Sequence, residues 1–315
     1  MKIAFLTDPL TSFKTYKDST YAMMAEAAER GHALYAFQQK DMALNGGVVS
    51  ANACRITLTG DEHNWFRADL PHETELTAFD AIIERKDPPF DMEYIYGTYL
   101  LEVAERAGAR VFNSPAAIRN HNEKMAIAEF PQFTAPTLVS SSEARLRAFF
   151  LLHHDIILKP LDGMGGSGVF RVKSDGLNLG AIIEMLTDNG QRTIMAQRFI
   201  PEIVKGDKRI LVIGGKAVPF SLARIPQGGE VRGNLAAGGT GVAQPLTAHD
   251  RVIAEALGPI LAQRGLLLVG LDVIGDCLTE VNVTSPTCFQ EIKQQTGFDV
   301  AAMFVDALEQ AVAGA

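Results

Sequence analysis

A glycine-rich segment between two strand signals most constrains the fold of this 315-residue chain. Residues 155–173 read DIILKPLDGMGGSGVFRVK, where one apolar run ends at Lys159 and another follows the glycines. Gly163, Gly165 and Gly168 have the G-x-G-x-x-G spacing of a dinucleotide-binding loop, but that fingerprint requires a helix after the glycines. Here VFRV follows, which alternates like a strand. We therefore expect the glycines to join two strands, and we exclude the Rossmann and P-loop interpretations.

Two interpretations of this loop remain. Glycine is the usual turn residue, so the segment could be a simple hairpin turn. However, the loop has more glycines than a tight turn needs, and successive glycine amides can form a nest that binds an anion. Lys159 also places a charge at the end of an apolar strand, where it needs a partner. We favour a phosphate-binding loop.

The first third of the chain alternates strand and helix signals. The expected strands cover residues 2–7, 34–37, 80–84 and 110–112, and the expected helices cover residues 19–30 and 91–107, with another beginning at Pro115. This order predicts a parallel sheet with helices on its faces, and ligands beyond the carboxyl ends of its strands.

The alternation of predicted strands and helices changes near residue 122. Strands are expected at 133–139, 155–159, 169–173 and 193–200, around helices at 143–153 and 177–188. A hairpin at 208–213 and 217–222, a helix at 248–264, paired strands at 266–274 and 278–283, and one C-terminal helix complete the chain. The fold class is therefore α/β and α+β, and we expect domains at 1–121, 122–200 and 201–315.

A second candidate site lies on the hairpin formed by the paired strands. Glu280 and Asn282 share a face because they are two apart on one strand, and Asp272 lies on the partner strand. A two-residue loop would pair Asp272 with Thr279, whereas a three-residue loop would pair it with Glu280 and gather three oxygen side chains. Such ligands suit Mg²⁺ shared with substrate phosphates. The alternative is a solvated sheet face, but the apolar flanks favour the metal and an odd loop.

A third candidate is the glycine-rich segment 223–245, which we expect to be one long loop. Arg224, Arg232 and Asn234 could donate to phosphate or carboxylate groups there. The segment could be a disordered linker, but strand and helix signals resume directly after it. We therefore expect a hinged lid that orders when ligands bind.

Composition excludes several classes. The net charge of −8 and the pI of about 5.4 argue against a nucleic-acid-binding protein. Three scattered cysteines fit neither a disulfide framework nor a zinc site. The first residues are too short an apolar run for a signal peptide, and no stretch is long and apolar enough to span a bilayer. A cytoplasmic protein without membrane partners is expected.

Together these segments resemble the ATP-grasp superfamily, and within it the bacterial glutathione synthetases. The most specific segments are RKDPPFD (85–91), NEK (122–124), ILKPLDGMGG (157–166), GDKR (206–209), ARIPQGGEVRGNLAAGG (223–239) and GLDVIGDCLTEVNVTSPTC (270–288). The resemblance implies an ATP-grasp fold with an N-terminal parallel α/β domain, a central lid domain and a C-terminal ATP-binding domain. It also implies a homotetramer that uses ATP and Mg²⁺ or Mn²⁺ to join glycine to γ-glutamylcysteine through an acyl phosphate, giving glutathione, ADP and phosphate.

The resemblance further implies a role for individual residues. Those expected to bind ATP are Lys124, Lys159, Gly163, Met164, Gly165, Gly166, Ser167, Gln197, Phe199, Ile200 and Asp207. Those expected to face the transferred phosphoryl and acyl groups are Arg209, Arg224 and Arg232, and those expected to hold the metal are Asp272, Glu280 and Asn282. Those expected to bind the substrates are Asp18, Arg85, Asn234, Ser285, Pro286 and Thr287.

Two positions depart from the family pattern. Thr240 stands where relatives often carry a basic residue, and the long charged Arg198 lies at the expected adenine edge. The rival enzymes are other ATP-grasp ligases, such as D-alanine–D-alanine ligase or glutamate-adding ligases. A rival outside the enzymes is a synapsin-like protein that binds ATP without catalysis, although the complete metal trio and lid favour an enzyme.

Overall fold

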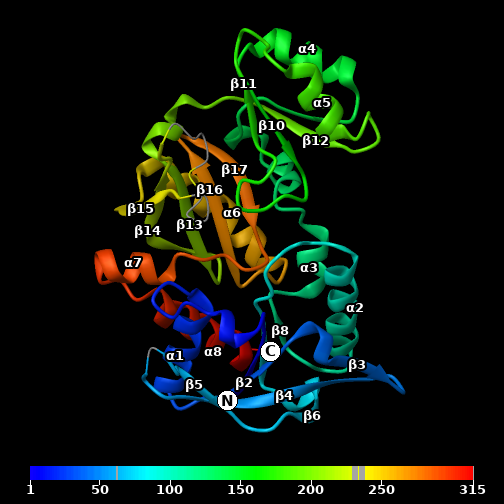
Figure 1. Ribbon diagram of the computed structural model, residues 1–315. Coiled ribbons are helices and arrows are strands. Elements are labelled where there is room, and N and C mark those ends of the chain that lie inside the picture. The colour runs from blue at the N-terminus through cyan, green and yellow to red at the C-terminus, as the bar shows by residue number, and fades with distance from the viewer. Residues whose placement is uncertain (62, 229–232, 234–237, 315) are drawn as a thin grey trace.

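The protein is described here by a computed structural model that covers residues 1–61, 63–228, 233 and 238–314. The described residues form three β-sheets with flanking helices, and the four-stranded sheet lies at the end opposite the N-terminal sheet (Figure 1). No helix in the described ranges is both long and apolar enough to cross a lipid bilayer. Short 3-10 helices lie at Leu10–Ser12, Gln39–Asp41, Leu76–Ala78, Met125–Glu129, Pro131–Phe133 and Pro201–Lys205.

The N-terminal sheet has eight strands in the order β3-β4-β2-β1-β7-β8, with β5 and β6 also paired to β4. Its strands are β1 Lys2–Leu6, β2 Ala33–Phe37, β3 Met42–Asn45, β4 Val48–Leu58, β5 Phe66–Ala68, β6 His72–Glu75, β7 Ala81–Glu84 and β8 Val111–Phe112. Its helices are α1 Ser19–Glu29, α2 Met92–Arg106 and α3 Pro115–Asn120. Because β1 alternates, Ile3 and Phe5 pack in the core that contains α1, while Ala4 and Leu6 pack in the core that contains α2.

The expected parallel sheet is only partly right. β2, β1, β7 and β8 are parallel, but β3 to β6 pair antiparallel to their neighbours. These strands occupy residues 42–75, for which the sequence predicts no helix or strand. Antiparallel strands need only short connections, so the helix-strand alternation that identified the parallel strands gives no signal for them.

The four-stranded sheet is antiparallel, in the order β11-β10-β12-β9. Its strands are β9 Thr137–Ser140, β10 Ile156–Pro160, β11 Phe170–Val172 and β12 Ile194–Arg198, and its helices are α4 Glu143–His153 and α5 Leu179–Thr187. Ile156 pairs with Val172 across β10 and β11. The glycine segment therefore joins two antiparallel strands, which confirms the exclusion of a Rossmann loop.

The C-terminal sheet has five strands in the order β15-β14-β13-β16-β17. Its strands are β13 Asp207–Ile213, β14 Lys216–Ile225, β15 Thr240–Pro245, β16 Leu268–Ile274 and β17 Cys277–Asn282, and its helices are α6 Ala248–Gln263, α7 Phe289–Thr296 and α8 Val300–Ala313. The prediction of a single C-terminal helix is therefore wrong. The segment forms two helices because Gly297, with a φ of 76°, ends α7.

The expected 23-residue loop at 223–245 is also too long. Both of its ends belong to paired strands, and Ile225 of β14 pairs with Thr240 of β15. The glycines at the centre of this segment masked the strand signal at its ends. The connection between the two strands is residues 226–239, of which 229–232 and 234–237 lie outside the described residues.

The first and last parts of the chain share one hydrophobic core. Ile3 and Met23 from the N-terminal part pack in the same cluster as Leu211, Phe289 and Phe304 from the C-terminal part. The four-stranded sheet has its own cluster, which includes Leu146 and Ile183. The sheet that carries the glycine loop thus has a core of its own, although Met195 of β12 packs in the cluster of the five-stranded sheet. The five-stranded sheet also packs on the N-terminal sheet and helices. The domain boundaries at 121/122 and 200/201 stay a prediction.

Candidate active site

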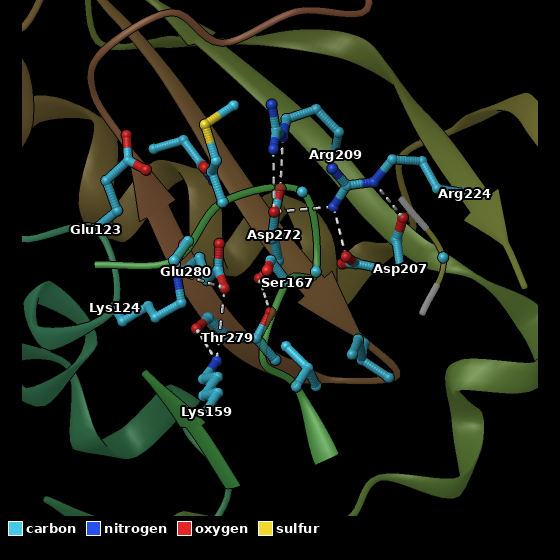
Figure 2. A pocket seen from close by; sticks show the side chains of 18 of the residues that line it. Glu123, Lys124, Lys159, Ser167, Asp207, Arg209, Arg224, Asp272, Thr279 and Glu280 are labelled. Carbon is cyan, nitrogen blue, oxygen red and sulfur yellow. Dashed lines mark hydrogen bonds and ion pairs between the residues drawn. The ribbon is translucent and has the colours of Figure 1, made fainter. Parts of the chain in front are cut away.

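A cavity of about 350 Å³ lies between the four-stranded and five-stranded sheets and contains most of the predicted site residues (Figure 2). The predicted residues that line it are Lys124, Lys159, Gly163, Met164, Gly165, Gly166, Ser167, Gln197, Phe199, Ile200, Asp207, Arg209, Arg224, Asp272, Glu280, Asn282, Ser285, Pro286 and Thr287. Residues far apart in sequence and carried by different sheets therefore meet in one place.

Among the described residues, two predicted site residues, Asp18 and Arg85, do not line this cavity. Two others, Arg232 and Asn234, lie outside the described residues. Asp18 is the N-cap of α1 and accepts a hydrogen bond from Tyr21 N at 2.8 Å. Arg85 is buried, and its Nε donates to the Thr20 hydroxyl at 3.0 Å. Arg85 Nη1 is buried with no partner in the described part of the chain, which leaves it a donor for a ligand.

Two lysines approach the same carboxylate from one side of the cavity (Figure 2). Lys159 Nζ at the end of β10 lies 3.6 Å from Glu280 Oε1, and Lys124 Nζ lies 3.5 Å from the same oxygen. Lys159 Nζ also donates to the carbonyl of Thr279 at 3.3 Å. Burial lowers the pKa of Lys159, and Glu280 opposes that change. Two buried ammonium groups with one shared carboxylate leave positive charge for an anionic ligand.

The glycine loop folds back over the strand that precedes it. A Cβ at Gly163 would lie 2.9 Å from the Pro160 ring and would clash with it, and one at Gly168 would lie 3.1 Å away and would require the ring to shift. Gly165 and Gly166 have φ values of 61° and 81°, which favour glycine. Lys124 Nζ donates to the Gly163 carbonyl at 2.5 Å and ties this loop to the lysine pair.

The register of the β16–β17 hairpin brings Asp272, Glu280 and Asn282 to one face, but not through the expected loop. Ile274 pairs with Cys277, so the turn has two residues and not an odd number. A β-bulge then inserts Thr279, and beyond it Asp272 pairs with Glu280. The shared face is confirmed, and the predicted odd loop is wrong because the extra residue lies within the strand.

Two buried arginines bind the carboxylate of Asp272 (Figure 2). Arg209 donates to both of its oxygens, and Arg224 Nη2 lies 2.8 Å from Oδ2. Although burial raises the pKa of Asp272, these two guanidinium groups hold it well below its ordinary value. Asp272 is therefore an anion at neutral pH. The two guanidinium groups that it binds could also bind a phosphate.

Asp207 forms the second carboxylate of this cluster. Its Oδ2 accepts from Arg224 Nη2 at 2.5 Å, whereas its Oδ1 is buried without a partner among the described residues. Burial raises the pKa of Asp207 to about 6, against the opposing charge of Arg224. A buried acceptor without a donor is costly, so Asp207 Oδ1 is suited to accept a ligand hydroxyl or amine.

The predicted metal ligands fit Mg²⁺ in chemical type. Asp272 and Glu280 offer carboxylate oxygens, and Asn282 offers its carboxamide oxygen because its Nδ2 already donates to Gly270 O at 3.0 Å. The described residues contain no group of three His, Cys, Asp or Glu side chains that could hold a metal by themselves. The set therefore suits an ion that completes its coordination with phosphate oxygens and water.

Several lining residues were not predicted as site residues. They are Asp87, Pro88, Glu123, Ile157, Val169, Arg198, Ile203, Gly233, Ile274, Thr279, Thr284 and Cys288. Glu123 accepts from the Val283 and Thr284 amides at 3.0 Å and 3.3 Å, and burial raises its pKa. Its place beside Lys124 in the NEK segment was the available signal. The apolar residues gave none, because in sequence they look like core.

Two family models match this chain. Residues 1–119 match the N-terminal domain of prokaryotic glutathione synthetase, and residues 123–297 match its ATP-grasp domain. The glutathione synthetase of Ralstonia nicotianae is 65% identical over 311 residues, covering 99% of this chain and 96% of the relative. That of Nitrosomonas europaea is 60% identical over 316 residues, covering 99% of both.

Solved structures show the same architecture at low identity. A D-cycloserine synthetase aligns with a TM-score of 0.68 and 16% identity, covering 99% of this chain and 100% of that one. An ATP-grasp protein with a RimK domain from Sphaerobacter thermophilus aligns with a TM-score of 0.62 and 19% identity, covering 97% and 98%. These likenesses concern the fold, which is that of ATP-grasp ligases.

Proposed function

The chain belongs to the prokaryotic glutathione synthetase family, and from this premise we propose a role for each part of the site. The chain is an ATP-dependent ligase that joins glycine to γ-glutamylcysteine and gives glutathione, ADP and phosphate. The observation that carries the assignment of roles is the convergence of Lys124, Lys159, Arg209 and Arg224 on Asp272 and Glu280 in one cavity.

The lysine side of the cavity binds the ATP phosphates. Lys124 and Lys159 supply two buried charges, and the glycine loop lines the same cavity, where its backbone amides would donate to phosphate oxygens. The strand end at Gln197–Ile200 borders the adenine, and the apolar residues Ile157 and Ile274 line the same cavity. Asp207 Oδ1, buried without a partner in the described ranges, accepts a nucleotide hydroxyl or amine.

The arginine side of the cavity serves the transferred group. Arg209 and Arg224 neutralise charge on the γ-phosphoryl group as it moves to the carboxylate of γ-glutamylcysteine. This phosphorylation is needed because an amine does not readily attack a free carboxylate. Asp272, Glu280 and Asn282 hold Mg²⁺, or Mn²⁺ in its place. When bound, this ion supplies further charge neutralisation at the phosphates. Closure of the Gly163–Gly168 loop over the phosphates would help to keep water from the acyl phosphate.

The residues that we assign to the peptide substrate lie near the contact between the Ser285–Thr287 turn and the segment that follows β7. Ser285 Oγ donates to the carboxylate of Asp87, so the Ser285–Thr287 turn meets the segment that follows β7. Arg85 keeps a buried donor, Nη1, that has no partner among the described residues, and burial raises the pKa of Asp18. We assign Arg85, Asp18 and this turn to the peptide substrate. Arg232 and Asn234 stay predictions for the acyl group and the substrate.

One assay tests these roles together. ADP release should require ATP, Mg²⁺, γ-glutamylcysteine and glycine, and mass spectrometry should identify glutathione. Replacing glycine by alanine tests amine selection, because fit alone discriminates a methylene by only about 1–3 kcal/mol. Turnover without added Mg²⁺ or Mn²⁺ would contradict the metal role. Equal turnover with larger amines would contradict strict selection of glycine and leave the ligase mechanism in place.

Assembly and location complete the proposal. We propose a homotetramer, which the family resemblance supports, and its mass in solution by light scattering tests it. We also propose a cytoplasmic location, supported by the three free cysteines Cys54, Cys277 and Cys288, which suit a reducing compartment. A dimer or monomer at assay concentration would contradict the tetramer.

A further inference from the structure

The bulge at Thr279 is not needed to bring the metal ligands to one face. The turn at Gly275-Asp276 pairs Ile274 with Cys277, and a regular ladder would continue by pairing Asp272 with residue 279. If Thr279 were absent, Glu280 would follow Leu278 directly and would occupy that paired position. A chain one residue shorter would therefore reach the same face without any irregularity.

The inserted residue makes two contacts next to the site. Its carbonyl accepts from Lys159 Nζ at 3.3 Å, and its hydroxyl donates to the Asp272 carbonyl at 3.1 Å. Thr279 is itself buried and lines the cavity. Figure 2 shows its carbonyl facing the Lys159 ammonium below the Glu280 carboxylate.

These contacts bear on where Lys159 can lie. Without the Thr279 carbonyl, the ammonium would have Glu280 Oε1, at 3.6 Å, as its remaining partner on the hairpin. Glu280 is also assigned to the metal, so a lysine held only by Glu280 would compete with that ion. A neutral carbonyl holds the ammonium without using a carboxylate charge. A bulge of this kind redirects groups next to a site, at the cost of one unpaired strand residue.

We propose that Thr279 is a positioning residue for the known ligation. Its bulge supplies the carbonyl that fixes Lys159 for the ATP phosphates, and its hydroxyl fixes the bulge on β16. This inference rests on the phosphate role proposed above for Lys159. The competing explanation is that the bulge only adds twist to the hairpin, in which case its removal would leave nucleotide binding unchanged.

A double-mutant cycle separates the two explanations. Affinity for the non-hydrolysable ATP analogue AMPPNP with Mg²⁺ is measured by calorimetry on the full chain for wild type, a deletion of Thr279, Lys159→Met and the combination. The deletion should weaken binding about tenfold, which is the loss expected for one hydrogen bond to a charged group. In the Lys159→Met background the deletion should change nothing, because the group that it positions is gone.

Every outcome has a defined meaning. Wild-type affinity in a folded deletion variant, or an equal loss in both backgrounds, overturns the inference. Unchanged affinity in Lys159→Met contradicts the phosphate role of that lysine, which is a separate failure of the proposed function. If the deletion does not fold, Thr279→Val and Thr279→Ser take its place. Thr279→Val should weaken AMPPNP binding only when Lys159 is present, whereas Thr279→Ser should bind AMPPNP like wild type. Equal affinities of the Thr279→Val and Thr279→Ser variants would overturn the proposal.

Discussion

Arg209 donates two hydrogen bonds to Asp272, from Nε to Oδ1 at 2.5 Å and from Nη2 to Oδ2 at 3.0 Å. Both side chains are buried, so each compensates a charge that would otherwise be costly away from water. The planar fork of arginine suits a carboxylate and a phosphate equally well. The same guanidinium can therefore remain satisfied when it exchanges one anion for the other.

Gly270 makes room for this arginine. A Cβ at that position would lie 2.8 Å from Arg209 Cδ and 3.0 Å from Pro286 Cβ. We expect Gly270→Ala to displace Arg209 and to lower kcat at least tenfold, as for a lost charged contact in the transition state. Steady-state kinetics measures this, with Gly314→Ala at the end of α8 as the control. A kcat equal to that of wild type would mean that Arg209 does not act on the transferred group.

Glu280 should determine the need for a divalent ion. Glu280→Gln keeps the shape of the side chain and removes its charge, so the concentration of Mg²⁺ that gives half-maximal ADP release should rise about tenfold or more. The exposed Glu184→Gln on α5 is the matched control. An unchanged Mg²⁺ requirement would remove Glu280 from the metal site, whatever its effect on the nearby lysines.

Lys159 should matter to ATP more than to folding. Lys159→Met keeps most of the apolar stem and removes the ammonium, so we expect the KM for ATP to rise at least tenfold, from the loss of a charge-assisted contact. Because burial lowers the pKa of Lys159, its removal should not lower the midpoint of thermal unfolding much. Calorimetry and kinetics measure the two effects, with the exposed Lys173→Met as the control.

Glu84 should give stability a distinct pH dependence. It is buried at the end of β7, its Oε2 accepts from Tyr94 Oη at 2.9 Å, and burial raises its pKa to about 8 from 4.5. The folded state thus binds the proton more tightly than the unfolded state, so Glu84 lowers the free energy of unfolding as pH rises from about 4.5 to about 8. Glu84→Gln should be progressively more stable than wild type over that range.

Chemical denaturation at pH 5, 6, 7 and 8 measures this difference. Each pKa unit corresponds to about 1.4 kcal/mol, so the advantage of Glu84→Gln should reach a few kcal/mol at the upper end. The exposed Glu255→Gln on α6 is the control for a simple loss of charge. A stability difference that stays constant with pH would mean that Glu84 is not the group that titrates.

The sequence determined the chemical parts of this site, because each part depends on local pattern. The strand-like VFRV after the glycines excluded a Rossmann loop, and β10 and β11 confirm this as an antiparallel pair. Lysine at the end of an apolar strand and oxygen ligands two apart on a strand are also local features. Spacing of two places Glu280 and Asn282 on one face in any regular strand.

Only the tertiary structure decided how those parts combine. With Thr279 present, a regular ladder from the two-residue turn would pair Asp272 with Thr279, and only the bulge moves this pairing to Glu280. No local sequence signal marks that bulge. The antiparallel strands at residues 42–75 and the pairing of β14 with β15 depend on partners distant in sequence. The buried arginines meet Asp272 because neighbouring strands bring them there, and their charges are stable only in that arrangement.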